Sequence, residues 1–164
     1  MFRFAKVALV LAVALVYSLI IFNSITNYDS NYLFFSHDLV KDVALPGGSS
    51  MWGAMDTWVG HTAVYVGIIL WQLLILLLCW WGGLRLANAL GRSALEFQQA
   101  KRLAKVGLTL GLLMWLLAVM SAGNEWSAMW RSRSWNGHEG TFGMFVLFAV
   151  ALLLLTSSEM PRKA

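Results

Sequence analysis

The chain has 164 residues, of which 59% are hydrophobic and 12% charged, and its mean hydropathy is +0.67. An average soluble domain is about 45–50% apolar and about 25% charged. This composition excludes a disordered chain and a coiled coil, and it indicates a single membrane-embedded domain. The single cysteine, Cys79, excludes an intrachain disulfide framework and a cysteine-based zinc site.

Four apolar stretches are long enough, or nearly so, to cross the hydrocarbon core of a bilayer, which takes roughly 20 helical residues. They cover residues 5–22, 62–82, 106–122 and 141–158. The sequence therefore predicts an all-α membrane protein, with residues 1–164 forming one four-helix transmembrane bundle. Arg3 and Lys6 also give the first stretch the basic start of a signal peptide. That alternative is weaker, because the apolar run is long and no Ala-x-Ala cleavage site follows it.

Basic residues are sorted by side. Nine of the 12 Lys and Arg residues lie near the termini or in the connection 83–105, and three lie in the segments 23–60 and 123–140. Because cytoplasmic loops carry an excess of Lys and Arg, both termini and the 83–105 hairpin are predicted to be cytoplasmic. The sequence pI of about 9.5 is then a sign of topology, and nucleic-acid binding is not expected.

The hairpin carries signals for a helix end and a helix start. Ser93-x-x-Glu96 has the form of a capping box, and Gly91 stands where a left-handed residue often ends a helix. The second and third helices are therefore predicted to extend past the bilayer and to turn at residues 91–92. Polar residues at the start of the third helix are expected in or near the headgroup layer: Gln98, Gln99, Lys101 and Arg102.

Small residues and one amide mark possible helix contacts. Gly107-x-x-x-Gly111 in the third span and Ala14-x-x-x-Ser18 in the first allow helices to approach closely, either within the bundle or between two chains. Gln72 is expected to face the bundle interior, because an amide facing lipid is costly; a hydrogen bond between subunits is the alternative.

The outward side carries most of the unusual residues. Residues 23–31 are polar and predict turns, and short amphipathic helices are expected near 33–40 and 51–58, which would form a structured cap. Five tryptophans on this side form either an interfacial belt or a wall for a partner or an apolar ligand such as a quinone. These are Trp52, Trp58, Trp126, Trp130 and Trp135.

All three histidines also fall on the outward side, together with most of the acidic residues. His37, His61 and His138 are candidate metal ligands, but their spacing matches no metal motif, so a site would have to be assembled across loops. The alternative is that these residues cap helices and pair with basic residues. No enzymatic signature is present, and the weakest hypothesis is a catalytic site of His37, Glu125 and Asp29.

Two motifs carry a resemblance to a known family. Asn-Tyr-Asp-Ser-Asn at 27–31 and Glu-Trp-x-x-Met-Trp at 125–130, with Trp-Asn-Gly at 135–137, resemble a bacterial family of predicted small integral membrane proteins of unknown function. The resemblance implies four spans and the inner membrane of Gram-negative bacteria, with segments 23–60 and 123–140 in the periplasm. Gln72 departs from an acidic residue expected in this pattern, and His138 departs from a glutamine. The family supplies no activity.

The sequence thus favours a non-catalytic accessory or scaffold subunit of a larger inner-membrane complex, respiratory or transport. The alternative is a protein that binds or transports a quinone, a lipid or a metal through its periplasmic cap. The expected partners are the lipid bilayer and a membrane protein, and no cofactor is expected. Candidate binding residues are Asn27, Tyr28, Asp29, Asn31, His37, Glu125, Trp126, Trp130, Trp135 and Asn136.

Overall fold

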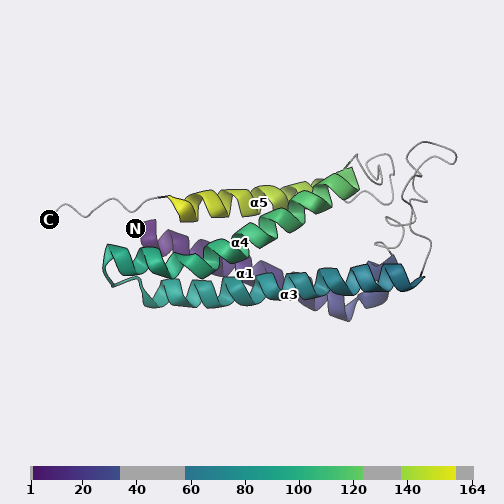
Figure 1. Cartoon of the computed structure of the whole chain (residues 1–164), viewed down its shortest axis with the longest axis horizontal. Helices are drawn as coiled ribbons and strands as arrows, with labels where there is room; N and C mark the ends of the chain where they lie inside the picture. Colours follow the sequence, from purple (N-terminus) through teal and green to yellow (C-terminus); the bar gives the residue numbers. More distant parts are fainter. Residues whose placement is uncertain (1, 34–57, 124–137, 158–164) are drawn as a thin grey trace.

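A computed structural model of the chain describes residues 2–33, 58–123 and 138–157 (Figure 1). In these ranges all regular structure is helical, so the all-α prediction is confirmed. The four long helices are α1 (Phe2–Thr26), α3 (Trp58–Asn88), α4 (Ala94–Gly123) and α5 (His138–Thr156). A short helical segment, residues 28–33, follows α1 after Asn27. The short helices expected near 33–40 and 51–58 fall almost entirely outside the described residues.

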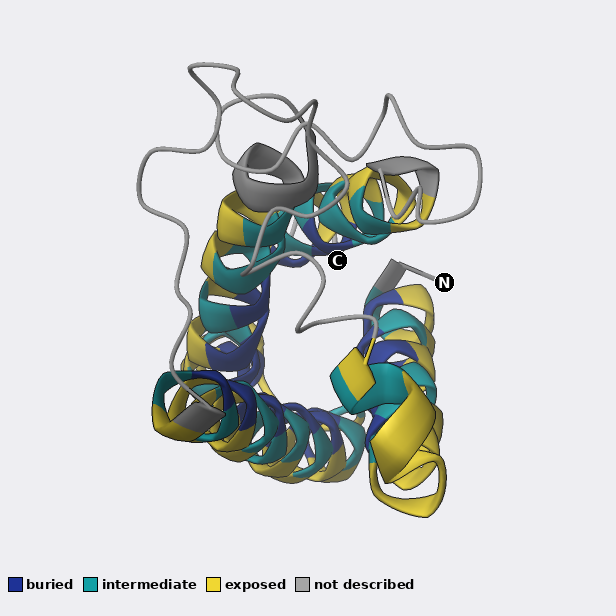
Figure 2. Ribbon diagram, turned by 90° about the vertical axis from the view of Figure 1, so that its right-hand side faces the viewer, coloured by how far each residue is buried: buried dark blue, intermediate teal, exposed yellow. Residues whose placement is uncertain are grey.

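The helices pack in chain order. Helix α1 packs against α3, α3 against α4, and α4 against α5, whereas α1 and α5 share few contacts. Viewed along the long axis, the four helices follow a C-shaped outline with the buried residues on its inner side (Figure 2). In Figure 1, α4 and α5 diverge from α1 and α3 with distance from the α3–α4 turn. We call the end at this turn the closed end and the opposite end the open end.

The outer surface of this assembly is apolar. Leu19, Leu77 and Leu153 are 62%, 63% and 70% exposed. Among the described helices, the stretches Arg3–Thr26 and Val59–Asn88 are long and apolar enough to cross a membrane, and Gly140–Thr156 is a shorter apolar helix. A soluble fold rarely leaves so much contiguous apolar surface in contact with water.

The helices extend beyond the predicted apolar stretches. Helix α3 has 31 residues, which at 1.5 Å per residue gives about 46 Å, longer than the roughly 30 Å core of a bilayer. The predicted hairpin between α3 and α4 is present, and its capping box is confirmed. The Ser93 backbone N–H donates to Glu96 Oε2 over 3.0 Å, and the Glu96 N–H donates to Ser93 Oγ over 3.3 Å. These bonds satisfy two N–H groups that the start of α4 leaves free.

The prediction for Gly91 is wrong, because this residue does not adopt a left-handed conformation. Helix α3 ends instead through tighter bonds between residues three apart. The Ala89 N–H donates to the Leu86 carbonyl over 3.1 Å, and the Leu90 N–H to the Ala87 carbonyl over 3.2 Å. A tightened last turn uses carbonyl groups that would otherwise need a left-handed cap.

Glycines set the distances between helices. A Cβ atom at Gly82 of α3 would lie 2.5 Å from the backbone nitrogen of Ala104 in α4. On α4, a Cβ at Gly107 would lie 3.0 Å from Cys79 Sγ, and one at Gly111 would overlap the ring of Phe148 in α5. Gly107 and Gly111 therefore pack against two different helices of the same chain. This is packing within the chain, one of the two alternatives left open by the sequence.

Gly82→Ala should destabilise the protein by about 1–3 kcal/mol, because the added methyl group meets backbone atoms that cannot move aside cheaply. The measurement is the free energy of unfolding of the purified protein in detergent. Gly67→Ala is the matched control, because its Cβ meets no atom of the described residues within 4 Å and alanine favours the helix. Equal stabilities of the two variants would contradict the close contact of α3 and α4.

Candidate functional site

The family-like motif at 27–31 begins at Asn27, directly after α1, and continues into the helical segment 28–33. Asn23, Asn27 and Asn31 follow at four-residue steps and so share one face. Asn27 Nδ2 donates to Asn23 Oδ1 over 2.7 Å, and Asn31 Nδ2 donates to the Asn27 carbonyl over 2.9 Å. The prediction of turns over 23–31 is confirmed at Asn27 alone and is wrong for the other residues, because these amides bond along the helix instead of competing with it.

The segment 28–33 also carries two tyrosines that pack against α3. Tyr28 and Tyr32 stack with ring centroids 5.8 Å apart, and Tyr65 of α3 meets both rings edge-on at 5.2 and 5.6 Å. The Tyr32 hydroxyl lies 3.3 Å from Thr62 Oγ1. We call Tyr28, Tyr32 and Tyr65 the tyrosine cluster. It fixes residues 28–33 against the first turns of α3, at the open end.

A buried histidine lies beside this cluster. His61 is one helical turn before Tyr65 on α3, and the two residues are 7% and 6% exposed. Tyr28 is 37% exposed and Asp29 is exposed, so the motif presents one aromatic ring and one carboxylate at the surface. Tyr28 and His61 are candidates from the sequence, whereas Tyr32 and Tyr65 were not predicted. The four-residue spacing of Tyr28 and Tyr32 in the sequence could have predicted a stacked pair, because residues four apart lie on one face of a helix.

Two indole groups tie α1 to its neighbours in the interior. Trp115 Nε1 of α4 donates to the Tyr17 hydroxyl over 2.8 Å, and Trp80 Nε1 of α3 donates to Ser18 Oγ over 3.1 Å. Tyr17 also meets the ring of Phe148 edge-on at 5.2 Å. Adjacent residues of α1 therefore join three other helices. In an apolar interior such bonds leave fewer polar groups unsatisfied.

Gln72 is an interior polar residue whose side-chain oxygen has no hydrogen-bond partner among the described residues. It is 7% exposed, so the prediction that it faces the interior is confirmed. Its Oε1 atom is buried and accepts no hydrogen bond from the part of the chain that the structure describes. Gln72 lies seven residues after Tyr65, about two turns further along the same face of α3. A buried carbonyl oxygen without a donor is costly, which makes this atom a candidate contact for a ligand.

Cationic groups gather at the closed end. Lys6 Nζ of α1 and Lys101 Nζ of α4 donate to the same carbonyl oxygen, that of Ser157 after α5, over 2.8 and 3.2 Å. Lys101 Nζ lies 5.5 Å from the centroid of the Phe97 ring, and the Arg3 guanidinium lies 5.0 Å from it. The Lys101 side chain is fully buried among the helices, and its expected place in or near the headgroup layer stays a prediction. The last carbonyls of a helix lack partners and attract cations.

Titratable groups do not gather into a metal site in the described ranges. Among residues 2–33, 58–123 and 138–157, no group of three His, Cys, Asp or Glu side chains is placed to hold a metal ion. Of the three histidines, the side chain of His61 is described. The remaining candidate residues lie outside the described positions or side chains: His37, His138, Glu125, Trp126, Trp130, Trp135 and Asn136. Their proposed convergence stays a prediction.

Long apolar helices with exposed leucines, joined by interior hydrogen bonds, are typical of a helical integral membrane protein. Residues 2–158 match the model of a family described as predicted small integral membrane protein (DUF2165), and the chain belongs to this family. The resemblance noted from the sequence motifs is thereby confirmed. Comparison with curated proteins and with solved structures found no match. The family description establishes insertion in a membrane and names no activity.

Tyr65→Leu should release residues 28–33 from α3, because two edge-on aromatic contacts of about 0.5–1.5 kcal/mol each are lost. Hydrogen exchange measured by mass spectrometry should show at least about tenfold faster exchange in this segment. Val66→Ala, at the exposed neighbouring position, is the control and should leave the exchange unchanged. Unaltered exchange of residues 28–33 in Tyr65→Leu would show that the tyrosine cluster does not hold this segment.

Proposed function

We propose that the chain is a non-catalytic accessory or scaffold subunit of a larger complex in a bacterial inner membrane. In this proposal α1, α3, α4 and α5 all span the bilayer, and both termini and the α3–α4 turn are cytoplasmic. The sorting of basic residues supports this orientation. The tyrosine cluster and the segments 34–57 and 124–137 then lie on the periplasmic side.

The observation that carries this proposal is the use of the interior polar side chains. Tyr17, Ser18, Trp80 and Trp115 bond one another across helices. At the closed end, the buried lysines bond the end of α5. These hydrogen bonds hold the helices in position, as expected of side chains with a structural role. They include no nucleophile activated by a neighbouring base.

The outward surface supports an assembly role as well. Leu70, Leu74 and Leu77 on one face of α3 are 60%, 49% and 63% exposed, so this face contacts lipid or another protein. Helices α1 and α5 share few contacts, so one side of the assembly is joined mainly at the closed end. At the open end this leaves helix faces to which transmembrane helices of a partner can pack.

The experiment is a crosslinking test that reads both orientation and partner. Ser30→Cys places a thiol at an exposed position of the 28–33 segment, and Gly91→Cys places one in the α3–α4 turn. A membrane-impermeant crosslinker with a maleimide at one end and a photoreactive diazirine at the other, added to intact spheroplasts and then illuminated, should join the Ser30→Cys variant to one specific protein. It should not react with Gly91→Cys until the membrane is opened. The wild type, whose Cys79 is buried, is the control.

Two results would contradict the proposal. If the Ser30→Cys variant remains a monomer, or joins only to copies of itself, after crosslinking and mild-detergent purification, the chain is not an accessory subunit held at this surface. If Gly91→Cys reacts in intact spheroplasts, the orientation is reversed.

A second candidate function is the binding of a small molecule, and Gln72 is the observation that favours it. Its buried Oε1 atom accepts no hydrogen bond from the described residues, and Gln72 lies about two turns from Tyr65 and about three turns from His61. An oxygen acceptor requires a donor, so the ligand would present a hydroxyl or an amine. A quinol or a lipid alcohol fits this chemistry, and the apolar surroundings suit its rings or chains.

Gln72→Leu separates the two functions. If no ligand donates to Oε1, removal of a buried unsatisfied oxygen should raise the free energy of unfolding by about 1–3 kcal/mol. If a ligand binds there, the wild-type protein should carry a small molecule, seen by mass spectrometry after solvent extraction, and the variant should lose it. Thr109→Val, an exposed polar-to-apolar change on α4, is the control. A stabilised Gln72→Leu whose extract matches the wild type would eliminate the second function.

A further inference from the structure

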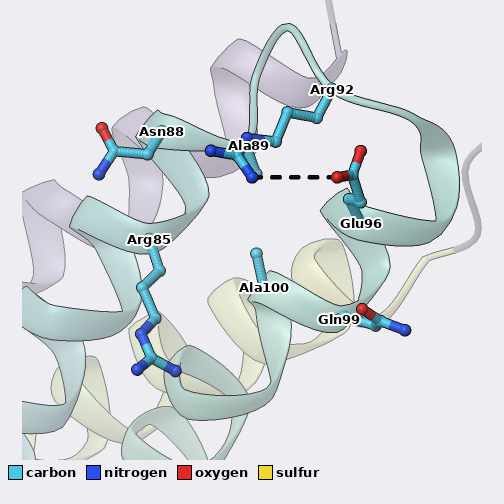
Figure 3. A pocket seen from close by; sticks show the side chains of 7 residues that line it. All are labelled: Arg85, Asn88, Ala89, Arg92, Glu96, Gln99 and Ala100. Carbon is cyan, nitrogen blue, oxygen red and sulfur yellow. Dashed lines mark ion pairs between the residues drawn. The ribbon is translucent and has the colours of Figure 1, made fainter.

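A polar pocket of about 330 Å³ lies at the closed end, between the last turn of α3 and the first turns of α4 (Figure 3). Its lining includes Arg85 and Asn88 from α3, Arg92 from the turn, and Glu96, Gln99 and Ala100 from α4. None of these residues belongs to the tyrosine cluster or to the interior around Gln72. The pocket is therefore a separate feature of the fold.

The pocket combines two cations with one anion. In Figure 3 the Arg92 side chain reaches toward Glu96, and the closest atoms, Nη1 and Oε1, are 3.9 Å apart. The two side chains are 62% and 50% exposed, and an ion pair this long and this exposed contributes little free energy. A ligand that brings an anionic group close to Arg92 and a cationic group close to Glu96 can therefore replace this ion pair with little loss of free energy.

Both charged groups at the mouth of the pocket are positioned by other contacts. The second carboxylate oxygen of Glu96, Oε2, accepts bonds from the Ser93 N–H and hydroxyl, which leaves Oε1 toward the pocket. These bonds lower the pKa of Glu96, so its carboxylate is ionised at neutral pH. The backbone carbonyl of Arg92 accepts a 2.7 Å hydrogen bond from the Arg3 guanidinium of α1, which fixes the turn.

An apolar track leads away from the pocket along α3. The Arg85 guanidinium lies 5.7 Å from the centroid of the Trp81 ring. Trp81 and Leu77, at four-residue steps back along the helix, are 62% and 63% exposed. A tryptophan next to an arginine at the end of an apolar helix is typical of the boundary between headgroups and acyl chains. The pocket therefore sits at headgroup level if α3 spans the membrane.

We propose that this pocket binds the headgroup of a phospholipid that carries both a phosphate and a protonated amine, of the phosphatidylethanolamine type. The phosphate interacts with Arg85 and Arg92, the ammonium group interacts with Glu96, and the acyl chains run along Trp81 and Leu77. This inference depends on the membrane-spanning placement of α3 and not on a protein partner.

The chemistry of the lining selects this class of headgroup. The guanidinium fork matches phosphate oxygens, and a primary ammonium has three N–H donors for a carboxylate. A choline headgroup has no N–H to donate to Glu96. A headgroup with a phosphate and no amine would bring a negative charge close to the Glu96 carboxylate without compensation.

The test measures lipid retention by native mass spectrometry of the full chain purified in mild detergent. Phosphatidylethanolamine, phosphatidylcholine and phosphatidylglycerol with the same acyl chains are added at equal concentration. We expect the ethanolamine lipid to be retained about tenfold more strongly than the choline lipid, as for one charge-assisted hydrogen bond. Glu96→Gln should abolish this preference while preserving the helix start, because glutamine also serves in a capping box.

Arg85→Gln should weaken retention of the ethanolamine lipid about tenfold. Arg102→Gln, which removes the same charge from an exposed position of α4 outside the pocket, is the matched control and should not. Thermal unfolding of each variant verifies that it is folded. Equal retention of the ethanolamine and choline lipids, stronger retention of the glycerol lipid, or equal effects of Arg85→Gln and Arg102→Gln would each overturn the proposal. Displacement of the lipid by millimolar inorganic phosphate alone would overturn it in favour of a soluble anion.

Discussion

One carbonyl oxygen, that of Ser157, accepts hydrogen bonds from two buried ammonium groups, and the positions of three helices depend on this contact. Lys6 comes from α1, Lys101 from α4, and the oxygen from the end of α5. Removing an ammonium group from water costs several kcal/mol, so buried lysines persist where acceptors meet them. The carboxyl end of a helix supplies such acceptors. This contact joins α1 to α5, which share few others.

The two ends of the molecule differ because their contacts differ. At the closed end, glycines allow close approach of neighbouring helices: Gly82 meets the backbone of Ala104, and Gly83 meets the side chain of Leu11. Toward the open end, the contact between α1 and α3 is made by aromatic rings and not by glycines. Helices α4 and α5 diverge from α1 and α3 in this direction (Figure 1). The proposed partner surface and the proposed lipid pocket therefore lie at opposite ends. A variant of one is expected to leave the other intact.

Local signals in the sequence predicted much of the fold. Apolar stretches located the helices, and Ser93-x-x-Glu96 located the start of α4, because each signal depends on neighbouring residues alone. The interior position of Gln72 followed from the cost of placing an amide in lipid. The buried position of Lys101 could not be predicted, since it depends on the end of α5, 56 residues away. The same holds for Tyr65 and residues 28–33, which meet through tertiary packing. The intrinsic turn preference of Asn23, Asn27 and Asn31 predicted turns. In the structure, their side chains form hydrogen bonds along the helix instead.

Packing in chain order has a consequence for how the protein folds. Each helix contacts mainly the helix synthesised before it, so most native contacts between helices form between consecutive helices. Helix α3 can pack on α1, and α4 on α3, while the remainder of the chain is still on the ribosome. The bonds from Lys6 and Lys101 to Ser157 are the exception, because they require α5 to be complete. These two hydrogen bonds therefore form only after the contacts among α1, α3 and α4 are possible, and they complete the closed end of the C-shaped assembly (Figure 2).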